Sequence, residues 1–449
     1  MLLSRKGRLR PARQSAQARH SALRKSVIAA SAAVLLFGPT AAVATAEPDA
    51  GAGVELPAEL VEALGRDLKI SAEDYLARAD LAQQVAAFTA TAQDKYPQVF
   101  AGSWLDDAGK AVVALTQGAG ADEARAAAES AGFEVRTVAR SEAALREEKS
   151  AFERWLDDQP EEVARLVRGV VIDTVNNTVA VAVDQVGVPM PSFIDPARVF
   201  VIAPPVAAEP VPEATPIASD INRASLTGGD GFTSAGSESS LRCSFGFNAV
   251  DGSGATVNIS AGHCDPDVAT AGTAAASSVH ELLPGDNLGA RLGSFQKSVL
   301  GSQDYSIIRI DDAAAGRFAN NGVRVPGAAP IRVEGVAVPV VGAPVCKAGS
   351  RTGFSCGIVN AVDQSVQVGD RLLTQSFSAN ICALPGDSGG PIVTGRLALG
   401  ISSASSVADY PICAIPNLIG ALTGNAPQLF AQPLSVVLAD NPGLRIRTE

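Results

Sequence analysis

The stretch Gly386-Asp387-Ser388-Gly389-Gly390-Pro391 decides how the rest of the chain is interpreted. Glycines on both sides of a serine let the backbone turn sharply, bring two N–H groups close to a reacting carbonyl, and leave the small hydroxyl uncovered. Such a serine is typical of a nucleophile, and a glycine-rich hairpin turn with an incidental serine is the alternative. The segment from Gly386 to Gly390 also satisfies the G-x-S-x-G pattern of an α/β-hydrolase elbow, in which the catalytic histidine follows the serine.

The histidines decide between the two hydrolase arrangements. The chain has three of them, His20, His263 and His280, and all three precede Ser388. The elbow order therefore fails, whereas the order histidine, aspartate, serine survives. Because His20 lies in a basic leader and His280 has the polar neighbours of a solvated loop, His263 is the candidate base.

His263 and Asp304 are the candidate partners of the serine. A lone histidine at a strand end, such as His263 after the apolar run 256–261, is more often structural than catalytic. Asp304 opens the apolar run 305–310, where its carboxylate can be buried against an imidazole, select the tautomer and stabilise the imidazolium. Alone, Asp304 would be interpreted as an ordinary residue at a strand end. The three residues together form a candidate triad.

Length, charge and composition narrow the class of protein. The 449 residues are enough for two domains with sizeable cores. The net charge of −11 and the absence of basic clusters beyond the leader argue against nucleic acid as the main partner. Many small residues and few aromatic ones indicate a β-rich protein. We expect neither a cofactor nor a metal ion.

Residues 1–46 have the features of a secretory signal peptide. Basic side chains precede an apolar run, 27–37, that is too short to span a bilayer as a stable helix. Gly38 and Pro39 interrupt this run, which disfavours the alternative of a retained membrane anchor. Ala44-Thr45-Ala46 is an A-x-A cleavage site. We therefore expect cleavage after Ala46, an extracellular product and no membrane contact after the cut.

Residues 47–186 are predicted to form an α+β region without a catalytic cluster. Ser71 is the expected N-cap of a helix within 56–99. Asn176-Asn177 is the expected turn of a hairpin formed by 170–172 and 178–183. Further helices and strands are expected at 121–131, 141–158, 100–104, 111–115 and 134–139.

Residues 187–225 are predicted to be a linker and processing region. Prolines recur across 187–223, remove backbone donors and discourage packed secondary structure. The composition changes near Ser225, where a different pattern begins.

Residues 226–449 are predicted to form an all-β domain. Short strands separated by Gly, Ser, Asn and Asp turns indicate an antiparallel barrel or sandwich. The expected strands are 244–250, 256–261, 305–310, 332–341, 357–362, 371–378, 391–393 and 398–402. Only 433–438 has the pattern of a helix.

Four motifs in this region occur in a defined order along the chain. They are Ser260-Ala261-Gly262-His263-Cys264, Asp304-Tyr305-Ser306-Ile307-Ile308-Arg309, the run CKAGSRTGFSCG at 346–357, and CALPGDSGGP at 382–391. Together they resemble the streptogrisin and α-lytic protease group of chymotrypsin-fold serine proteases, over about residues 226–440. This resemblance implies two six-stranded antiparallel β-barrels. Residues 100–116 and 170–183 resemble, more loosely, the pro-region with which that family's secreted bacterial endopeptidases are made as zymogens.

The resemblance also implies a role for each residue of the triad. Ser388 would attack the scissile carbonyl, His263 would take its proton and return it to the leaving amine, and Asp304 would orient His263. The N–H groups of Gly386 and Ser388 would form the oxyanion hole, in agreement with the interpretation of the glycines themselves.

Three disulfides are a further implication of the resemblance. It pairs Cys243 with Cys264, Cys346 with Cys356, and Cys382 with Cys413. Counting six cysteines alone leaves the pairing open. A structural zinc site is the alternative, which the lack of a repeated C-x-x-C and the expected secretion both disfavour.

Two positions depart from the family pattern. Lys347 stands where arginine commonly occurs, and we expect it to neutralise Asp387 without offering a bidentate fork. Ser403-Ala404-Ser405 replaces the usual Ser-Gly-Gly of the substrate-binding strand. Ser403 can still support Asp304, whereas the added side chains at 404 and 405 reshape the pocket.

The substrate pocket is expected to accept an apolar P1 residue. Its predicted lining is Ala383, Leu384, Ser402, Ser403, Ala404 and Ser405. None of these side chains is acidic, which argues against Lys or Arg substrates, and Ser402 stands where a glutamate-selective member would carry histidine. We expect the mature N-terminus within 225–228, with a cut after Leu226.

The leading hypothesis is a secreted serine endopeptidase made as a zymogen. It would act on proteins or peptides through an acyl-enzyme, as a monomer, with its own pro-region as folding aid and inhibitor. A catalytically weak or inactive peptide-binding homologue and an esterase using the same triad are the alternatives.

Overall fold

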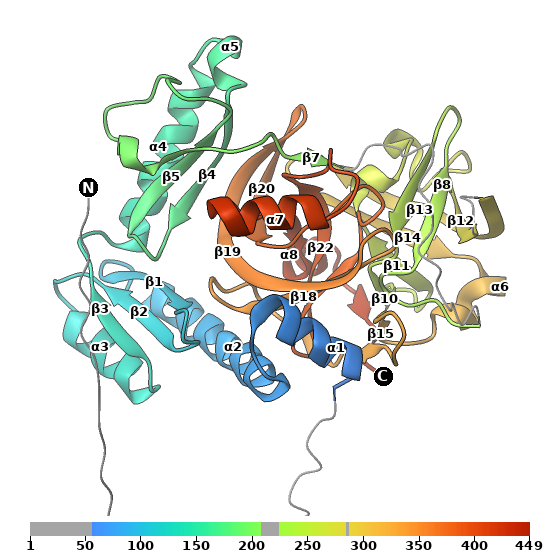
Figure 1. The fold of residues 1–449 in the computed structure, drawn as a ribbon, viewed down its shortest axis with the longest axis horizontal. Coiled ribbons are helices and arrows are strands. Elements are labelled where there is room, and N and C mark those ends of the chain that lie inside the picture. The colour runs from blue at the N-terminus through green and yellow to red at the C-terminus, as the bar shows by residue number, and fades with distance from the viewer. Residues whose placement is uncertain (1–55, 208–223, 284–286) are drawn as a thin grey trace, which may run out of the picture. The chain divides into compact units, whose positions relative to one another are not determined.

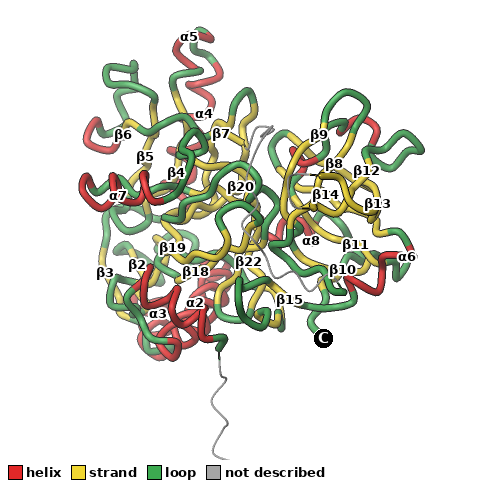
Figure 2. The backbone as a smooth tube through the Cα atoms, turned by 45° about the vertical axis from the view of Figure 1, so that its right-hand side comes forward, coloured by secondary structure: helices red, strands yellow, loops and turns green. Residues whose placement is uncertain are grey.

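The computed structural model describes residues 56–207, 224–283 and 287–449. The predicted signal peptide and residues 208–223 of the predicted processing region lie outside these ranges. An α+β region comes first, and a mostly β region follows from residue 224, as Figures 1 and 2 show by label and by colour. No helix among the described residues has the length and apolar character needed to cross a membrane.

Two of the helices in the α+β region begin at serine caps. Ser71 Oγ accepts the Asp74 N–H, and Ser141 Oγ accepts the Ala144 N–H, so each first turn has one of its free donors satisfied. The helices are α1 (Ala58–Ala63), α2 (Ala72–Lys95), α3 (Ala121–Ser130), α4 (Glu142–Asp157) and α5 (Glu161–Ala164), with a π-helical turn at Leu64–Leu68. The helices predicted for this region are confirmed within a few residues.

The strands of the α+β region form two groups. The first group is a three-stranded sheet of β1 (Phe100–Leu105), β2 (Ala111–Leu115) and β3 (Glu134–Thr137). The second is the hairpin of β4 (Val167–Asp173) and β5 (Thr178–Val183). Asn177 has a φ of 52°, a conformation that asparagine tolerates and that this turn requires.

The described part of the predicted linker contains strands, which corrects the expectation that it lacks packed secondary structure. After a 3-10 turn at Pro196–Arg198, β6 (Val199–Val201) pairs in parallel with β5. Further on, β7 (Val206–Ala207) pairs antiparallel with β22 (Leu397–Ser405). The physical reason is that proline removes a donor only at its own position, so Val206 and Ala207 keep their N–H groups.

The first part of the β region is an eight-stranded sheet in the order β24-β10-β11-β14-β13-β12-β8-β9. Phe232, Phe245, Phe295 and Phe318 are fully buried in its core. His280 lies half-buried on β12 opposite Thr233, which corrects its assignment to a solvated loop. The strands are β8 (Gly231–Ala235), β9 (Ser240–Ser244), β10 (Phe247–Val250), β11 (Thr256–Ser260), β12 (Ser278–Leu283), β13 (Asn287–Leu300), β14 (Asp304–Ile310) and β24 (Arg445–Ile446).

The second part contains six strands that pair in a closed ring. The order is β18-β21-β22-β23-β20-β19, and β18 pairs again with β19. Their bounds are Pro344–Gly349 for β18, Gly353–Val368 for β19, Arg371–Ala379 for β20, Pro391–Thr394 for β21 and Leu429–Pro433 for β23. Strand β4 of the α+β region adds to β19, with Val170 opposite Ser365.

Short elements surround these two sheets. The predicted strand 332–341 is reduced to β16 (Ile331–Arg332), which pairs with β15 (Gly322–Val323), and to β17 (Gly335–Val336), which pairs with β22. The helical elements are η3 (Gly262–Cys264), η4 (Val268–Thr270), α6 (Asp312–Ala315), η5 (Gly316–Phe318), α7 (Ala414–Thr423) and α8 (Leu434–Ala439).

Helix α8 confirms the predicted C-terminal helix, whereas α7 was missed. The apolar residues of α7 do not form a buried stripe, because Ile415, Leu418, Ile419 and Leu422 are exposed. Ile415, Leu418, Ile419 and Leu422 recur at the i, i+3, i+4, i+7 spacing of one helix face, so the sequence held a helical signal that was not recognised.

Candidate active site

The pairing of β11 with β14 brings His263 to Asp304. Ser260 at the end of β11 lies opposite Ser306 near the start of β14, so the residues just past one strand meet the first residue of the other. His263 Nδ1 lies 2.6 Å from Asp304 Oδ2, and the His263 backbone N–H donates to Oδ1 at 2.9 Å. A carboxylate can only accept, so Nδ1 carries the proton and Nε2 is left as the basic nitrogen.

Two residues of the six-stranded ring also bind Asp304. Ser403 Oγ on β22 donates to Oδ2, and Gln432 Oε1 on β23 accepts the Asp304 N–H at 3.1 Å. Burial of the carboxyl group by itself raises the pKa of Asp304. The charge and hydrogen bond of His263, with the Ser403 hydroxyl and the His263 N–H, outweigh this effect and lower that pKa below its usual value.

The loop around Ser388 is hydrogen-bonded to the eight-stranded sheet and to the six-stranded ring. The Ser388 carbonyl accepts the Ser244 N–H from β9 at 2.8 Å, and the Gly389 N–H donates to the Ser402 carbonyl on β22 at 2.8 Å. Gly389 has a φ of 77°, and a Cβ built there would lie only 2.0 Å from Ser260 Oγ. Glycine is therefore required at 389 for the loop to approach the strand that leads to His263.

Ser388 and His263 share no hydrogen bond in this structure. His263 Nε2 is buried and has no hydrogen-bond partner among the described residues. Gly386 has a φ of 102°, and neither its N–H nor that of Ser388 donates to any described residue. Within the described part of the chain, the N–H groups of Gly386 and Ser388 thus have no acceptor, and Nε2 of His263 has no partner.

Asp387, next to the serine, is enclosed by hydrogen-bond donors. Lys347 Nζ lies 3.2 Å from Oδ2, and the exposed fractions of the two side chains are 0% and 1%. Thr352 Oγ1 accepts from Lys347 Nζ at 2.5 Å and donates to the same Oδ2 at 2.6 Å. The N–H groups of Arg351, Thr352 and Leu384 supply three further donors to the carboxylate.

The predicted pocket residues lie together beside Ser388. All six of them line one small cavity, together with Val206, Pro385, Asp387, Ala408 and Leu429; the six are Ala383, Leu384, Ser402, Ser403, Ala404 and Ser405. The cavity has a volume of about 10 Å³, which is room for roughly one water molecule. Strand β7 lies along its wall, where Val206 faces Ser405 and Ala207 faces Ala404 in the antiparallel register.

Comparison with known proteins identifies the family. Residues 252–424 match the family model described as Trypsin. The chain is 34% identical over 182 residues to Serine protease 2 of Streptomyces fradiae, a match that covers 40% of this chain and 95% of that protein. The chain belongs to the trypsin family of serine proteases.

A second relative agrees with this assignment. Streptogrisin-C of Streptomyces griseus is 32% identical over 185 residues, covering 41% of this chain and 36% of that protein. Among solved structures, the crystal structure of Thermobifida fusca protease A aligns with 50% of this chain and 100% of its own chain, with 25% identity and a TM-score of 0.38. The resemblance drawn from the motifs is confirmed, and this trypsin-family chain is a serine endopeptidase.

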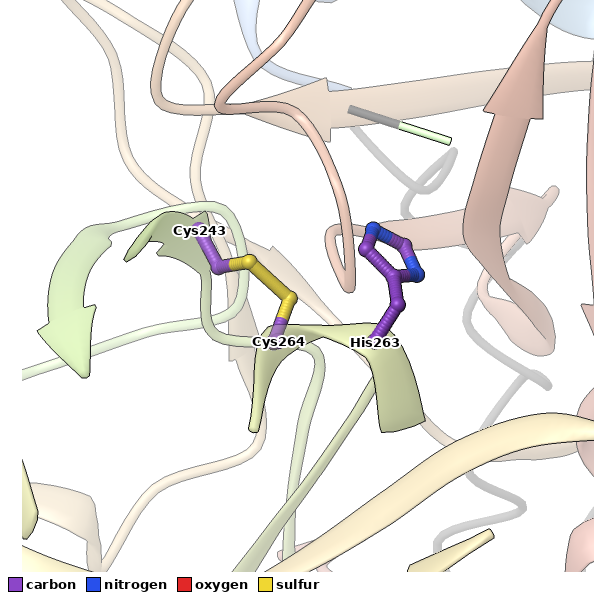
Figure 3. A group of neighbouring side chains, drawn as sticks. All are labelled: Cys243, His263 and Cys264. Atoms are coloured by element: carbon purple, nitrogen blue, oxygen red, sulfur yellow. A yellow bond between two sulfur atoms is a disulfide. The ribbon is translucent and has the colours of Figure 1, made fainter. Parts of the chain in front are cut away.

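The cysteines of this protease pair as the resemblance implied. The bonds join Cys243 to Cys264, Cys346 to Cys356, and Cys382 to Cys413. Figure 3 shows the Cys243–Cys264 bond beside the His263 ring, and these three side chains have the types and spacing of a metal-ligand group. Because the two sulfurs are bonded to each other, neither can act as the thiolate that a metal would need.

Two residues of the protease site were missed by sequence reasoning. Thr352 links Lys347 to Asp387, and Gln432 holds the backbone of Asp304. The signal for Gln432 was present, because it is a polar residue inside the otherwise apolar run 429–434, and it is fully buried. A buried polar side chain in such a run needs a specific hydrogen-bond partner.

Proposed function

We propose that the chain is a secreted serine endopeptidase made as a zymogen, in which Ser388, His263 and Asp304 form the catalytic triad. The observation that carries the proposal is the fixed orientation of His263. Its Nδ1 and its backbone N–H are both held by one buried carboxylate, so Nε2 is the ring nitrogen that remains without a partner among the described residues and can accept a proton. This is the state that a general base needs.

Each residue then has one role in the reaction. Ser388 Oγ attacks the scissile carbonyl carbon while His263 Nε2 takes its proton, and Asp304 stabilises the resulting imidazolium. The N–H groups of Gly386 and Ser388 bind the oxyanion, and loss of one such donor costs about 10²–10³ in kcat. The imidazolium protonates the leaving amine, and water hydrolyses the acyl-enzyme by the same steps in reverse. Because Ser388 and His263 are not hydrogen-bonded here, that contact must form when a substrate binds.

Active-site titration tests the triad and separates the alternatives. The wild-type protein and Ser388→Ala would be treated with a serine-directed phosphonate and then incubated with casein and with a peptide ester. An endopeptidase is labelled and digests casein, and Ser388→Ala loses both properties, with kcat lower by about 10⁴–10⁶-fold. An esterase is labelled without digesting casein. A non-catalytic peptide-binding protein is not labelled.

The position of β7 supports the zymogen proposal. This strand uses the backbone of β22 from Ala404 to Ser405, which is where an extended peptide substrate would add as a strand. Polypeptide from the N-terminal side of the protease region thereby competes with substrate, as an inhibitor would.

The α+β region also has the contacts expected of a folding aid. Beyond the β4–β19 pairing, Gln83 on α2 exchanges two hydrogen bonds with the backbone of Val338, and Lys149 and Glu153 on α4 both bond Ser365 Oγ. Such contacts can order strands whose partners lie far apart in sequence. Refolding of residues 226–449 without the α+β region, at the full-length rate, would contradict this role.

The proposed architecture includes the two six-stranded barrels implied by the resemblance. The closed ring of β18 to β23 supports the second barrel. The first barrel would be built from strands of the eight-stranded sheet.

The processing cut is better placed upstream of Leu226 than after it. Leu226 is buried, its N–H donates to the Arg317 carbonyl, and its carbonyl accepts from Asn248 and Asn320. A protease cannot bind this segment as an extended strand unless it first unfolds. We therefore place the cut between β7 and Leu226. N-terminal sequencing of the secreted wild type and of Ser388→Ala shows where the cut is and whether it is autocatalytic.

Secretion and an apolar P1 preference complete the proposal. Three disulfides suit an oxidising compartment outside the cytoplasm. The carboxylate of Asp387 on the pocket wall is already bonded to Lys347 and Thr352, so it does not favour a basic P1 side chain. A library of substrates that differ only at P1 tests this preference, and fastest cleavage after Lys or Glu would contradict it.

A further inference from the structure

Two arginines flank the glycine of the proposed oxyanion hole. A Cβ built on Gly386 would lie 3.2 Å from Arg351 Cβ and 3.5 Å from Arg242 Nε. Arg242 belongs to β9 and precedes Cys243, whereas Arg351 belongs to the turn between β18 and β19. Both side chains are half-buried. Two elements that are distant in sequence therefore each place an arginine beside Gly386.

The nearby carboxylate of Asp387 does not pair with these guanidinium groups. Its oxygens accept from Lys347, from Thr352 and from backbone N–H groups, including that of Arg351 itself. The Arg351 guanidinium makes no hydrogen bond or ion pair with any residue in the described ranges. Arg242 Nη2 donates to the Ser350 carbonyl at 3.3 Å, which keeps its guanidinium beside the turn that carries Arg351.

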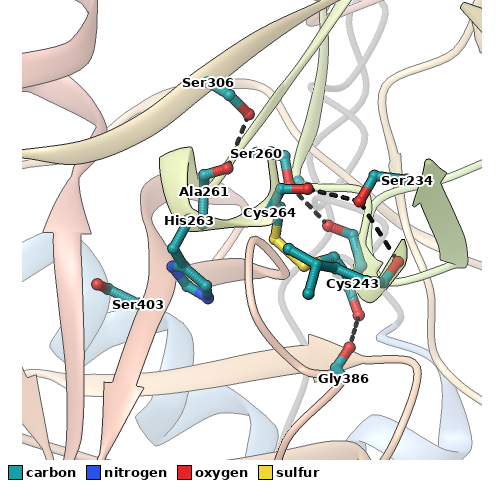
Figure 4. Close-up of a disulfide and its surroundings, with 12 residues drawn as sticks. Ser234, Cys243, Ser260, Ala261, His263, Cys264, Ser306, Gly386 and Ser403 are labelled. Carbon is teal, nitrogen blue, oxygen red and sulfur yellow. Dashed lines mark hydrogen bonds between the residues drawn. A yellow bond between two sulfur atoms is a disulfide. The ribbon is translucent and has the colours of Figure 1, made fainter. Parts of the chain in front are cut away.

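Strand β7 shows the direction in which a peptide crosses the site. Strand β7 is antiparallel to β22, with Val206 opposite Ser405 and Ala207 opposite Ala404. A chain that continued past Ala207 in this register would next lie opposite Ser403. In Figure 4, Ser403 lies on one side of His263, and Cys243 and Gly386 lie on the other. A substrate that continued in this direction would have the residues after its scissile bond on the Gly386 side of His263, where Arg242 and Arg351 lie.

We propose that Arg242 and Arg351 are specificity-determining residues that select an acidic side chain among the first three residues after the scissile bond. This inference rests on the proposed endopeptidase function. A guanidinium group matches a carboxylate in geometry and charge, and a lysine at the same substrate position would be repelled. The chain's own sequence is consistent with this preference, since Glu209 and Glu213 follow β7 before the next basic residue, Arg223.

Internally quenched peptides test the preference directly. They would share one acyl side and carry Glu, Gln or Lys at one of the first three positions after the bond, and kcat/KM would be measured for the secreted wild-type protein. A partly exposed ion pair changes an equilibrium by a factor of up to about 5, so two arginines should favour Glu over Gln by about fivefold to tenfold. The ratio should approach 1 in about 0.5 M NaCl, because salt screens such pairs.

Variants assign the effect to the two arginines. Arg351→Gln and Arg242→Gln should each lower the Glu-to-Gln ratio, whereas Arg351→Lys should keep part of it. Arg332→Gln on β16 is the matched control, since it removes one exposed arginine charge elsewhere, and its ratio should equal that of the wild type. A wild-type Glu-to-Gln ratio near 1, or a ratio unchanged in both glutamine variants, would overturn this inference and leave the proposed endopeptidase function standing. If no peptide were cleaved, the proposed function would fail and this inference with it.

Discussion

The two buried carboxylates that flank the nucleophile loop differ in the kind of cation each one holds. Asp304 lies against His263, whose imidazole can take up and release a proton during a reaction. Asp387 lies against Lys347, which is fully buried and is also linked to the carboxylate through Thr352. Both carboxylates accept backbone N–H groups as well, so their geometry is similarly rigid. The difference is that one pair can change its protonation state during a reaction and the other pair has only to keep a fixed shape.

This difference separates two tasks within one site. In the proposed mechanism, Asp304 selects the nitrogen of His263 that acts as the base, and so it would act on the chemical step. Asp387 is held by hydrogen bonds within the turn that carries Gly386 and Ser388, and so it would act on the position of the two N–H groups of the proposed oxyanion hole. Substitutions at the first site should therefore lower kcat in a folded protein, whereas substitutions at the second should first lower stability.

Replacement of Asp304 by asparagine should have the largest effect. The amide cannot hold His263 with its proton on Nδ1 in the same way, so kcat should fall by about 10⁴-fold while the protein stays folded. Steady-state kinetics on a chromogenic peptide measures the loss, and circular dichroism checks the fold. An Asp304→Asn variant with wild-type kcat would contradict the proposed role of Asp304 in the chemical step.

Replacement of Lys347 by methionine should mainly lower stability. It leaves the buried carboxylate of Asp387 without its charge partner, a change that typically costs about 3–5 kcal/mol in the free energy of unfolding. Urea unfolding in a Ser388→Ala background, which prevents autolysis, gives the value. The same substitution combined with Asp387→Asn removes both charges, and its additional cost should be smaller. If Lys347→Met lowered the unfolding free energy equally with Asp387 intact and in the Asp387→Asn background, Lys347 would not stabilise the protein through its pairing with Asp387.

Replacement of Gln432 by leucine should affect both stability and the chemical step, by a smaller amount. It leaves the buried Asp304 N–H without an acceptor, which costs about 1–3 kcal/mol. We expect a lower kcat with little change in KM, since the carboxylate is repositioned but the substrate groove is not.

The matched control for Gln432 is Gln364→Leu. Gln364 is also a buried glutamine whose Nε2 has no partner among the described residues, but its Oε1 accepts from Ser378 rather than from the triad. That variant should lose stability and retain kcat. A similar loss of kcat in both variants would mean that Gln432 has no specific role in positioning Asp304.

The pH dependence of stability should show the smallest effect. The folded pKa of Asp304 lies below its unfolded value of about 3.9, so its contribution to stability is present above that pH and is lost as the pH falls through the folded pKa. In the Ser388→Ala background, the unfolding free energies of the protein with Asp304 intact and of the Asp304→Asn variant should therefore converge below about pH 4. A difference that stays constant down to pH 2 would contradict the direction of the pKa shift.

The sequence by itself determined the family and the candidate triad. The glycines around Ser388, the position of every histidine upstream of it, and the acidic residue at the head of an apolar run were enough, because these are constraints of local backbone and of chain order. The caps at Ser71 and Ser141 and the turn at Asn177 belong to the same kind of local information. Each depends on residues within a few positions of one another.

Only the tertiary structure decided what meets at the site. Gln432 reaches Asp304 across 128 residues because strands of separate sheets come together there. Thr352 reaches Asp387 across 35 residues because β18 pairs with both β19 and β21 within one sheet. The pairing of β7 with β22 and the approach of Arg242 to Gly386 likewise join segments that no local pattern connects. Such contacts depend on strand order and register, which are set by packing of the whole chain rather than by the propensity of any one segment.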